Sequence, residues 1–241
     1  MFFLDNIDLS SKTPATENTM TKILGIIQTK GGAGRSTFAT NLAAHFSLRE
    51  PTTLIDCDLP QGTSSSWYAL RQTEFPSKDL FLAQARDHVE LIQKAKEHAS
   101  ESRYLIIDGP PRLAEMTRAI MILSDLCLIP LGASAAEIWS TTDLLQTLEE
   151  AKTYKPDVDA RLVWTRFRAY TREAQDLKDA VKKEINLREL RNRLGYRVAF
   201  SEALARGLSV EECADPNASA EVHKLAEEVK TILAEKKRWP K

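Results

Sequence analysis

The sequence predicts an α/β fold: a doubly wound, mostly parallel sheet flanked by helices. Short apolar, β-branched runs alternate along the chain with stretches of helical periodicity. These runs are continuously hydrophobic, which is typical of strands that are buried on both faces. The 241 residues are 43% apolar and 28% charged, a composition that suits one globular domain with a full core.

Seven runs are expected to form strands, and seven stretches between them are expected to form helices. The strands are expected at 23–28, 52–58, 80–84, 104–110, 126–131, 160–166 and 196–200. The helices are expected near 36–49, 64–74, 87–100, 114–124, 136–153, 171–194 and 218–237. Ligands of such a sheet bind at the carboxyl ends of its strands, so the loops after the strands are searched first.

The chain is expected to have a flexible extension at residues 1–21 and one domain at residues 22–241. The extension is polar and lacks a basic segment followed by a long apolar one, so it is not a secretion signal. No apolar stretch reaches the eighteen or so residues that span a bilayer. Of the three cysteines, Cys57 and Cys127 lie in apolar runs and Cys213 lies apart, which favours a reduced, cytoplasmic protein.

A phosphate-binding loop is predicted between the first strand and the first helix, where the chain reads "TKGGAGRST" (29–37). Its glycines permit a tight turn whose N–H groups point inward, and the N-terminus of the following helix favours an anion. Ser36 offers a hydroxyl to Mg²⁺ and Thr37 a further phosphate donor. Arg35 stands where such loops carry lysine, and Lys30 is a second basic residue.

Two further strand ends carry carboxylates. The segment "LIDCDLPQGTSSSW" (54–67) contains Asp56 and Asp58, and the strand in "RYLIIDGPP" (103–111) ends at Asp108. Phosphoryl transfer needs a carboxylate near the γ-phosphate and the metal, at the carboxyl end of a strand. Asp56, Asp58 and Asp108 are the carboxylates that can meet this demand. The residues alone leave open which of Asp56 and Asp58 positions the attacking water.

The loop "KGGAGRST" resembles the deviant Walker A motif of the ParA/MinD family of P-loop ATPases, because Lys30 matches the family's signature lysine. The aspartate segments, "SDLCLIPLGASAAEIWSTTDLL" (124–145) and the block at 197–229 follow in family order, so the resemblance covers roughly residues 22–235. It is nearest to ParA-type partition ATPases without an N-terminal helix-turn-helix domain. Arg35 departs from the motif, and arginine is planar and bulkier than lysine, which puts the rate of hydrolysis in doubt.

The resemblance implies a slow ATPase with ATP and Mg²⁺ as cofactors. Lys30 would reach the partner's phosphates in a nucleotide-sandwich homodimer, and Lys30, Arg35 and Asp58 would be the catalytic residues. Metal binding would involve Ser36, Asp56 and Asp108, and "WTRF" (164–167) would contact the base. The expected nucleotide contacts are Lys30, Gly31, Gly32, Ala33, Gly34, Arg35, Ser36, Thr37, Thr165 and Arg166.

Residues 161–209 contain twelve Lys or Arg and six Asp or Glu, a net charge of +6 in a chain of net charge −1. A basic stripe on one helix and its exit is typical of contact with the phosphate backbone of DNA, without sequence readout. A solvated helix with i,i+4 ion pairs is the alternative, because Glu184 and Arg188 have that spacing. The candidate DNA contacts are Lys178, Lys182, Lys183, Arg188, Arg191, Arg193 and Arg197.

The leading hypothesis is a nucleoid-associated ATPase that partitions or positions a cargo, with a ParB-like or cargo-adaptor protein stimulating hydrolysis. A MinD-like membrane switch is an alternative, but the tail 228–241 carries little apolar surface, and Val229, Ile232 and Leu233 are expected to pack on the domain. An electron-transfer reductase of the nitrogenase-iron-protein type would need two cysteines per subunit at the dimer axis to hold a cluster, and the location of Cys57 and Cys127 within apolar strands argues against it. An ATP-binding switch with little hydrolysis remains open because of Arg35.

Overall fold

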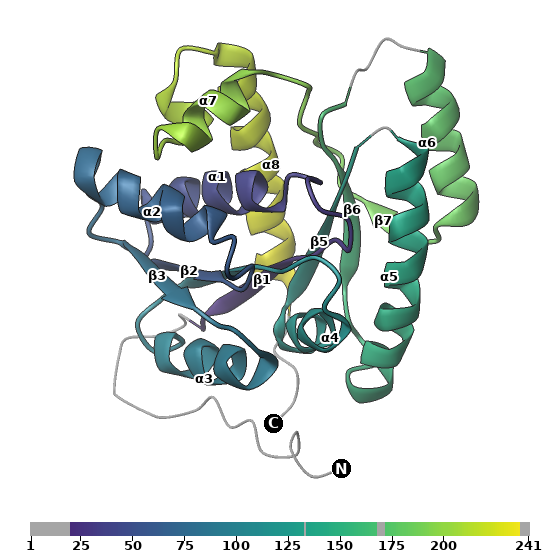
Figure 1. The fold of residues 1–241 in the computed structure, drawn as a ribbon, viewed down its shortest axis with the longest axis horizontal. Coiled ribbons are helices and arrows are strands. Elements are labelled where there is room, and N and C mark those ends of the chain that lie inside the picture. The colour runs from purple at the N-terminus through teal and green to yellow at the C-terminus, as the bar shows by residue number, and fades with distance from the viewer. Residues whose placement is uncertain (1–19, 133, 168–171, 237–241) are drawn as a thin grey trace.

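A computed structural model describes residues 20–132, 134–167 and 172–236. Its centre is a seven-stranded sheet in the order β3-β2-β4-β1-β5-β6-β7, in which every pairing is parallel (Figure 1). The predicted fold class is therefore confirmed. The strands are β1 (Lys22–Ile26), β2 (Thr52–Asp56), β3 (Leu80–Gln84), β4 (Tyr104–Asp108), β5 (Leu126–Leu131), β6 (Ala160–Trp164) and β7 (Arg188–Glu189).

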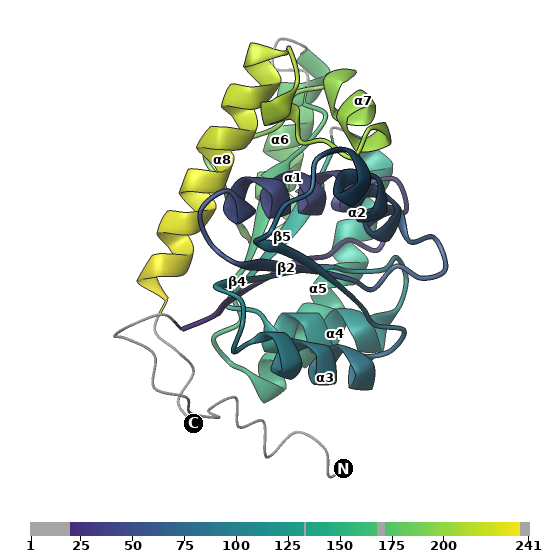
Figure 2. The same ribbon diagram turned by 90° about the vertical axis from the view of Figure 1, so that its left-hand side faces the viewer.

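Helices cover both faces of the sheet, as Figure 2 shows from the side. One face carries α1 (Arg35–Ser47), α2 (Thr63–Glu74), α7 (Ala199–Ala205), the 3₁₀ turn η1 (Val210–Glu212) and α8 (Pro216–Glu235). The other face carries α3 (His88–His98), α4 (Ala114–Leu123), α5 (Ala135–Tyr154) and α6 (Arg172–Glu184).

The strands are apolar at consecutive positions because they supply two cores at once. Side chains alternate between the faces of a sheet, so Leu24 and Ile26 pack in the core with α1 and α8. Ile23 and Ile27 pack in the opposite core with α4 and α5. This is the physical reason for the continuous hydrophobicity that predicted the strands.

Of two expected elements in the C-terminal third, the helix is confirmed but shorter than expected, and the strand is wrong. The helix expected at 171–194 ends at Glu184, and the chain continues through β7, which extends the sheet beyond β6. After β7, the N–H groups of Arg191 and Asn192 donate to the Glu228 carboxylate on α8, at 2.7 and 2.9 Å, which stabilises a non-helical path. The strand expected at 196–200 is absent there, and α7 begins at Ala199.

The last helix packs on the domain as expected. Asp215 caps its N-terminus by accepting from the N–H groups of Asn217 and Ala218. Val229, Ile232 and Leu233 are buried against the sheet and α1. Across the described residues, no helix has both the length and the apolar character to span a membrane. The expected extension up to residue 19 and the tail 237–241 lie outside the described residues.

Candidate nucleotide site

Three neighbouring strands bring the predicted motifs together at their carboxyl ends. β4 lies between β1 and β2, and Asp108 is in register with both Ile26 and Asp56. The loop 29–34 follows β1 and lies beside these carboxyl ends, because parallel strands end on the same side of the sheet. The glycine loop and the carboxylates of Asp56 and Asp108, predicted from separate motifs, therefore converge on one place.

The loop has the backbone of an anion-binding turn. Gly32 and Gly34 have φ angles of 74° and 88°, a conformation that L side chains rarely adopt. A Cβ atom built at Gly31, Gly32 or Gly34 would meet nothing within 4 Å, so the loop borders open space. The following α1 has no side-chain cap and no acidic residue in its first turn. Its N-terminal N–H groups and the helix dipole thus favour a bound phosphate.

Arg35 lies beneath the loop, and its residue surface is only 5% exposed. Its Nε donates to the carbonyl of Gly109 at 2.8 Å, and its Nη1 donates to those of Gln28 and Lys30 at 2.6 and 2.7 Å. Its Nη2 contacts the Asp58 carboxylate at the longer distance of 3.5 Å. The guanidinium therefore joins both ends of the loop to the end of β4, a role that the motif alone did not predict.

The Asp108 carboxyl fits a magnesium site. It is fully buried, Oδ2 accepts from Ser64 at 2.7 Å, and Oδ1 has no hydrogen-bond partner. Burial raises the pKa of Asp108 to about 7, while the Ser64 hydrogen bond and the nearby Ser36 hydroxyl oppose this shift. A buried, unsatisfied carboxylate oxygen beside the Ser36 hydroxyl matches the oxygen ligands, direct or through water, that Mg²⁺ prefers.

The structure separates the two other aspartates. Asp56 is buried, and its oxygens accept from the N–H of Asp58 and from the N–H and hydroxyl of Ser65, at 2.7 to 3.0 Å. These bonds position the turn into α2. The Asp58 side chain is 16% exposed and faces Arg35. Asp58 therefore remains more accessible to a ligand than Asp56.

Lys30 points to a carboxylate that sequence reasoning missed. Its Nζ lies 3.8 Å from Oε1 of Glu137, near the start of α5. Glu137 is buried, and it also accepts from the Gly132 N–H and pairs with Arg166. Gly132 permits this approach, since a Cβ there would lie 2.7 Å from Oε2 of Glu137. The only sequence signal was an acid in the segment 124–145, after the strand beside β1.

The predicted base-contact residues are near the loop, but they have other partners. Thr165 is buried, and its hydroxyl donates to the carbonyl of Ala33 at 3.4 Å. Arg166 has a positive φ of 52° and an exposed side chain that pairs with Glu137. Both residues follow β6, so they lie on the side of the sheet where the strands end and the loop begins.

The predicted DNA contacts lie at the β7 edge of the sheet rather than on one helix. Lys178, Lys182 and Lys183 are on α6, Arg188 is on β7, and the other three follow β7. Arg197 pairs with Glu221 at 2.7 Å, and Arg193 stacks 4.7 Å above the Phe167 ring. The exposed members are Lys182, Lys183, Arg188, Arg191 and Arg193.

A parallel sheet with a glycine loop, an uncapped helix N-terminus and converging carboxylates defines a P-loop type of nucleotide-binding protein. Residues 24–210 match the model of the CobQ/CobB/MinD/ParA nucleotide-binding domain, and the chain belongs to this family. The predicted resemblance to ParA/MinD proteins is thereby confirmed.

Individual relatives are similar over most of their length. The maintenance of carboxysome distribution protein A of Halothiobacillus neapolitanus is 29% identical over 216 residues, 88% of this chain and 94% of that protein. The solved structure of an aspartate-to-alanine variant of Cyanothece McdA in complex with ATP has a TM-score of 0.73 at 19% identity, covering 92% of this chain and all of that one. Cobyrinic acid a,c-diamide synthase from Mycobacterium smegmatis, with a bound ATP analogue and magnesium, has a TM-score of 0.71 at 16% identity, covering 91% and 98%.

Proposed function

We propose that this chain is a Mg²⁺-dependent ATPase that forms an ATP-sandwich homodimer, binds DNA nonspecifically and positions a cargo. The observation that carries the proposal is the division between the two basic residues of the loop. Arg35 is buried and braced against carbonyls of its own chain, whereas the Lys30 side chain is 34% exposed and directed to Glu137. Two cations of one loop that face different surroundings have different tasks.

Each residue of the site has a task that its position supports. The loop N–H groups and the start of α1 bind the phosphates, and Thr37 adds a hydroxyl. Ser36 and Asp108 hold the metal with its water, and Asp56 fixes the turn before α2. Bound Mg²⁺ neutralises the charge that develops on the transferred phosphoryl group. Asp58, accessible at the end of β2, orients the attacking water, and the Nη2 of Arg35 beside it reaches the phosphates.

Release of Lys30 from Glu137 requires little free energy. The pair is long, at 3.8 Å, and its lysine is partly exposed, so we expect it to contribute on the order of 1 kcal/mol, although Glu137 itself is buried. Glu137 would keep Arg166 and the Gly132 N–H as partners after Lys30 leaves. We infer that Lys30 exchanges this contact for the phosphates in the partner subunit when ATP closes the dimer.

Similar proteins and the distribution of charge support a proposed biological role. The similar protein of Halothiobacillus neapolitanus is named for carboxysome distribution, so we propose a large cargo rather than a small substrate. The exposed basic residues at the β7 edge would bind nucleoid DNA through its phosphates, in the cytoplasm. A ParB-like protein or cargo adaptor would stimulate hydrolysis and release. Thr165 and Arg166 are proposed to contact the base.

An ATP-binding switch with little hydrolysis is the second candidate, and the brace made by Arg35 favours it. A guanidinium held by three carbonyls has fewer donors left for the transition state than a mobile lysine. Comparing turnover with ATP-dependent dimerisation distinguishes the candidates. The ATPase proposal expects turnover that depends on the dimer, whereas the switch expects dimerisation almost without turnover.

Light scattering with ATP and Mg²⁺ tests the proposal. Asp58→Ala removes the proposed water-positioning carboxylate, so we expect it to trap ATP and form a stable dimer. Lys30→Ala in that background should bind ATP as a monomer, because the contact across the interface is lost. Glu137→Gln is a matched control, since it removes the pairing charge but keeps Lys30, and it should still dimerise. An ATP-dependent dimer of the Lys30→Ala, Asp58→Ala double variant would refute the task assigned to Lys30.

A further inference from the structure

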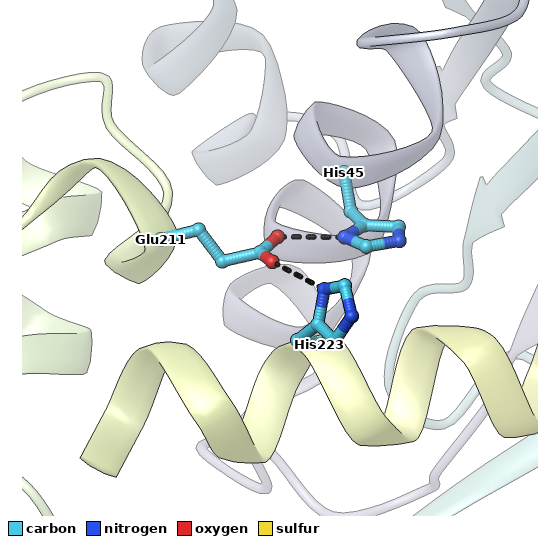
Figure 3. A group of neighbouring side chains, drawn as sticks. All are labelled: His45, Glu211 and His223. Carbon is cyan, nitrogen blue, oxygen red and sulfur yellow. Dashed lines mark hydrogen bonds and ion pairs between the residues drawn. The ribbon is translucent and has the colours of Figure 1, made fainter. Parts of the chain in front are cut away.

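Two histidines and a glutamate from distant parts of the chain meet at the far end of α1. Figure 3 shows the side chains of His45, Glu211 and His223 turned toward one another. The His45 Nδ1 lies 2.7 Å from Glu211 Oε2, and the His223 Nδ1 lies 3.4 Å from Glu211 Oε1. One ligand atom from each residue can be chosen so that all three lie within 4.8 Å of one another. They come from α1, η1 and α8, so the fold rather than a local motif assembles them.

The three groups are ligands of the zinc class. Two imidazoles and one carboxylate suit Zn²⁺ or Co²⁺, whereas Mg²⁺ and Ca²⁺ prefer oxygen alone. With metal–ligand bonds of about 2.0–2.1 Å, donor atoms of a tetrahedral site lie roughly 3.4 Å apart. The 3.4 Å contact matches that spacing, whereas the 2.7 Å contact is a hydrogen bond that must lengthen, and all three ligand atoms lie within 4.8 Å of one another. Shifts of about 1 Å would therefore let the side chains enclose an ion.

A second carboxylate stands behind the first histidine. The His45 Nε2 lies 3.6 Å from Oε1 of Glu227, which also pairs with Lys230. At 3.6 Å this contact is too long for a hydrogen bond, and in the metal-free protein the Nδ1 is hydrogen-bonded to Glu211. When a metal displaces the Nδ1 proton, a small shift of the ring would let Glu227 accept the Nε2–H, as is usual for metal-binding histidines. His45 also lies in the last turn of α1, where the helix dipole favours a cation.

We propose that His45, Glu211 and His223 bind one divalent transition-metal ion of the zinc class, with water as a further ligand. His45 and Glu211 are 10% and 15% exposed at their side chains, while His223 is 56% exposed, which gives the ion and its water access from solvent. The ion fastens η1 and α8 to α1. It is distinct from the magnesium of the phosphate loop, because ten residues of helix separate Arg35 from His45, about 15 Å.

Metal titration of the untagged full-length chain, freed of metal by a chelator, tests the proposal. Calorimetry with Zn²⁺ and with Co²⁺ should show one equivalent bound, and the unfolding temperature should rise with metal concentration. An excess of Mg²⁺ should not reproduce either effect. Co²⁺ should give visible absorption without a thiolate charge-transfer band, which excludes Cys213 as the ligand.

Variants locate the ion. His223→Ala changes a largely exposed residue, so the fold should persist while the equivalent of metal is lost. Glu227→Ala removes the acceptor behind His45 and should weaken binding by roughly 10–100-fold, as for loss of a group that orients a ligand. His88→Ala and His98→Ala, at the other two histidines of the chain, and Cys213→Ser should bind as the wild type does. No uptake by the wild type, or equal uptake by His223→Ala, would overturn the proposal.

Discussion

Replacing Arg35 with alanine should destabilise the nucleotide-free protein and abolish ATP binding. The change removes the donors to the carbonyls of Gln28, Lys30 and Gly109, and the cation beside Asp58. Breaking a buried charged network costs about 3–5 kcal/mol, because it leaves buried polar groups without partners. Water that enters the space replaces part of the lost bonding, which limits the cost. For a domain of this size, about 2–4 °C is lost per kcal/mol, so the unfolding temperature should fall by roughly 6–20 °C.

The matched variant Arg35→Lys separates the two expected roles of Arg35: the hydrogen bonds to three backbone carbonyls, which we call the brace, and the contact with phosphate. A lysine retains the charge and can reach a phosphate, but it cannot serve three diverging carbonyls with a planar fork. We expect intermediate stability, retained ATP binding, and turnover at or above that of the wild type. Differential scanning fluorimetry without nucleotide measures the brace, and calorimetry with ATP and Mg²⁺ measures the contact.

Arg71→Ala is the control for losing any buried arginine. Arg71 is 3% exposed and pairs with Glu212 at 2.7 Å, on a contact between α2 and η1 that is separate from the loop. It should lower the unfolding temperature without changing ATP affinity. If Arg35→Ala unfolds at the wild-type temperature, the brace does not exist in solution. If it keeps wild-type ATP affinity, the loop does not use Arg35 for phosphate.

Two other outcomes test the metal and the DNA surface. Asp108→Asn preserves shape but not charge, so calorimetry should show a stable protein in which Mg²⁺ no longer strengthens ATP binding; undiminished enhancement would exclude Asp108 from the magnesium site. Alanine at Lys182, Lys183, Arg191 and Arg193 should weaken binding to any duplex and flatten the salt dependence, by up to about 0.9 in log–log slope per lost phosphate contact. Arg197→Ala should have a smaller effect, because Arg197 is already paired with Glu221. Tight binding to one DNA sequence that is unchanged in all these variants would show that DNA binds elsewhere.

The sequence predicted β1, β2, β4, β5 and β6 because their burial on two faces appears as continuous hydrophobicity, and the half-exposed edge strand β3 because it too is a short apolar run. It extended the helix expected at 171–194 too far, because Ile185, Leu190 and Leu194 continue an apolar pattern that a helix would also show. These three residues are buried, but they pack against the sheet from β7 and its flanking turns. Local periodicity contains no information about Glu228, which accepts from the N–H groups after β7 and holds that segment out of a helix, because Glu228 lies more than thirty residues farther along the chain.

The phosphate site was predictable where its chemistry is local and hidden where it is not. The loop and Asp108 follow apolar strands, and parallel pairing places strand ends together, so their meeting could be inferred. The partner of Lys30 could not, because Glu137 is more than one hundred residues away and carries no motif of its own. The direction of the Arg35 side chain was equally hidden, since a motif gives the position of a residue and not the carbonyls around it.

The helix α1 shows why such partners are concentrated where they are. It was predicted from its helical periodicity, and it is not a surface helix with one apolar face: 10 of its 13 residues are buried between the sheet, α2 and α8. A buried polar side chain in such a helix needs a hydrogen-bond partner, because burial without one lowers the stability of the folded protein. Asn41 therefore accepts from the Val210 N–H at 2.9 Å, and His45 contacts Glu211, so both draw on the C-terminal segment. The burial that allows α1 to hold the phosphate loop rigidly is also what brings Glu211 and His223 to its far end, which is how one helix comes to carry two candidate sites.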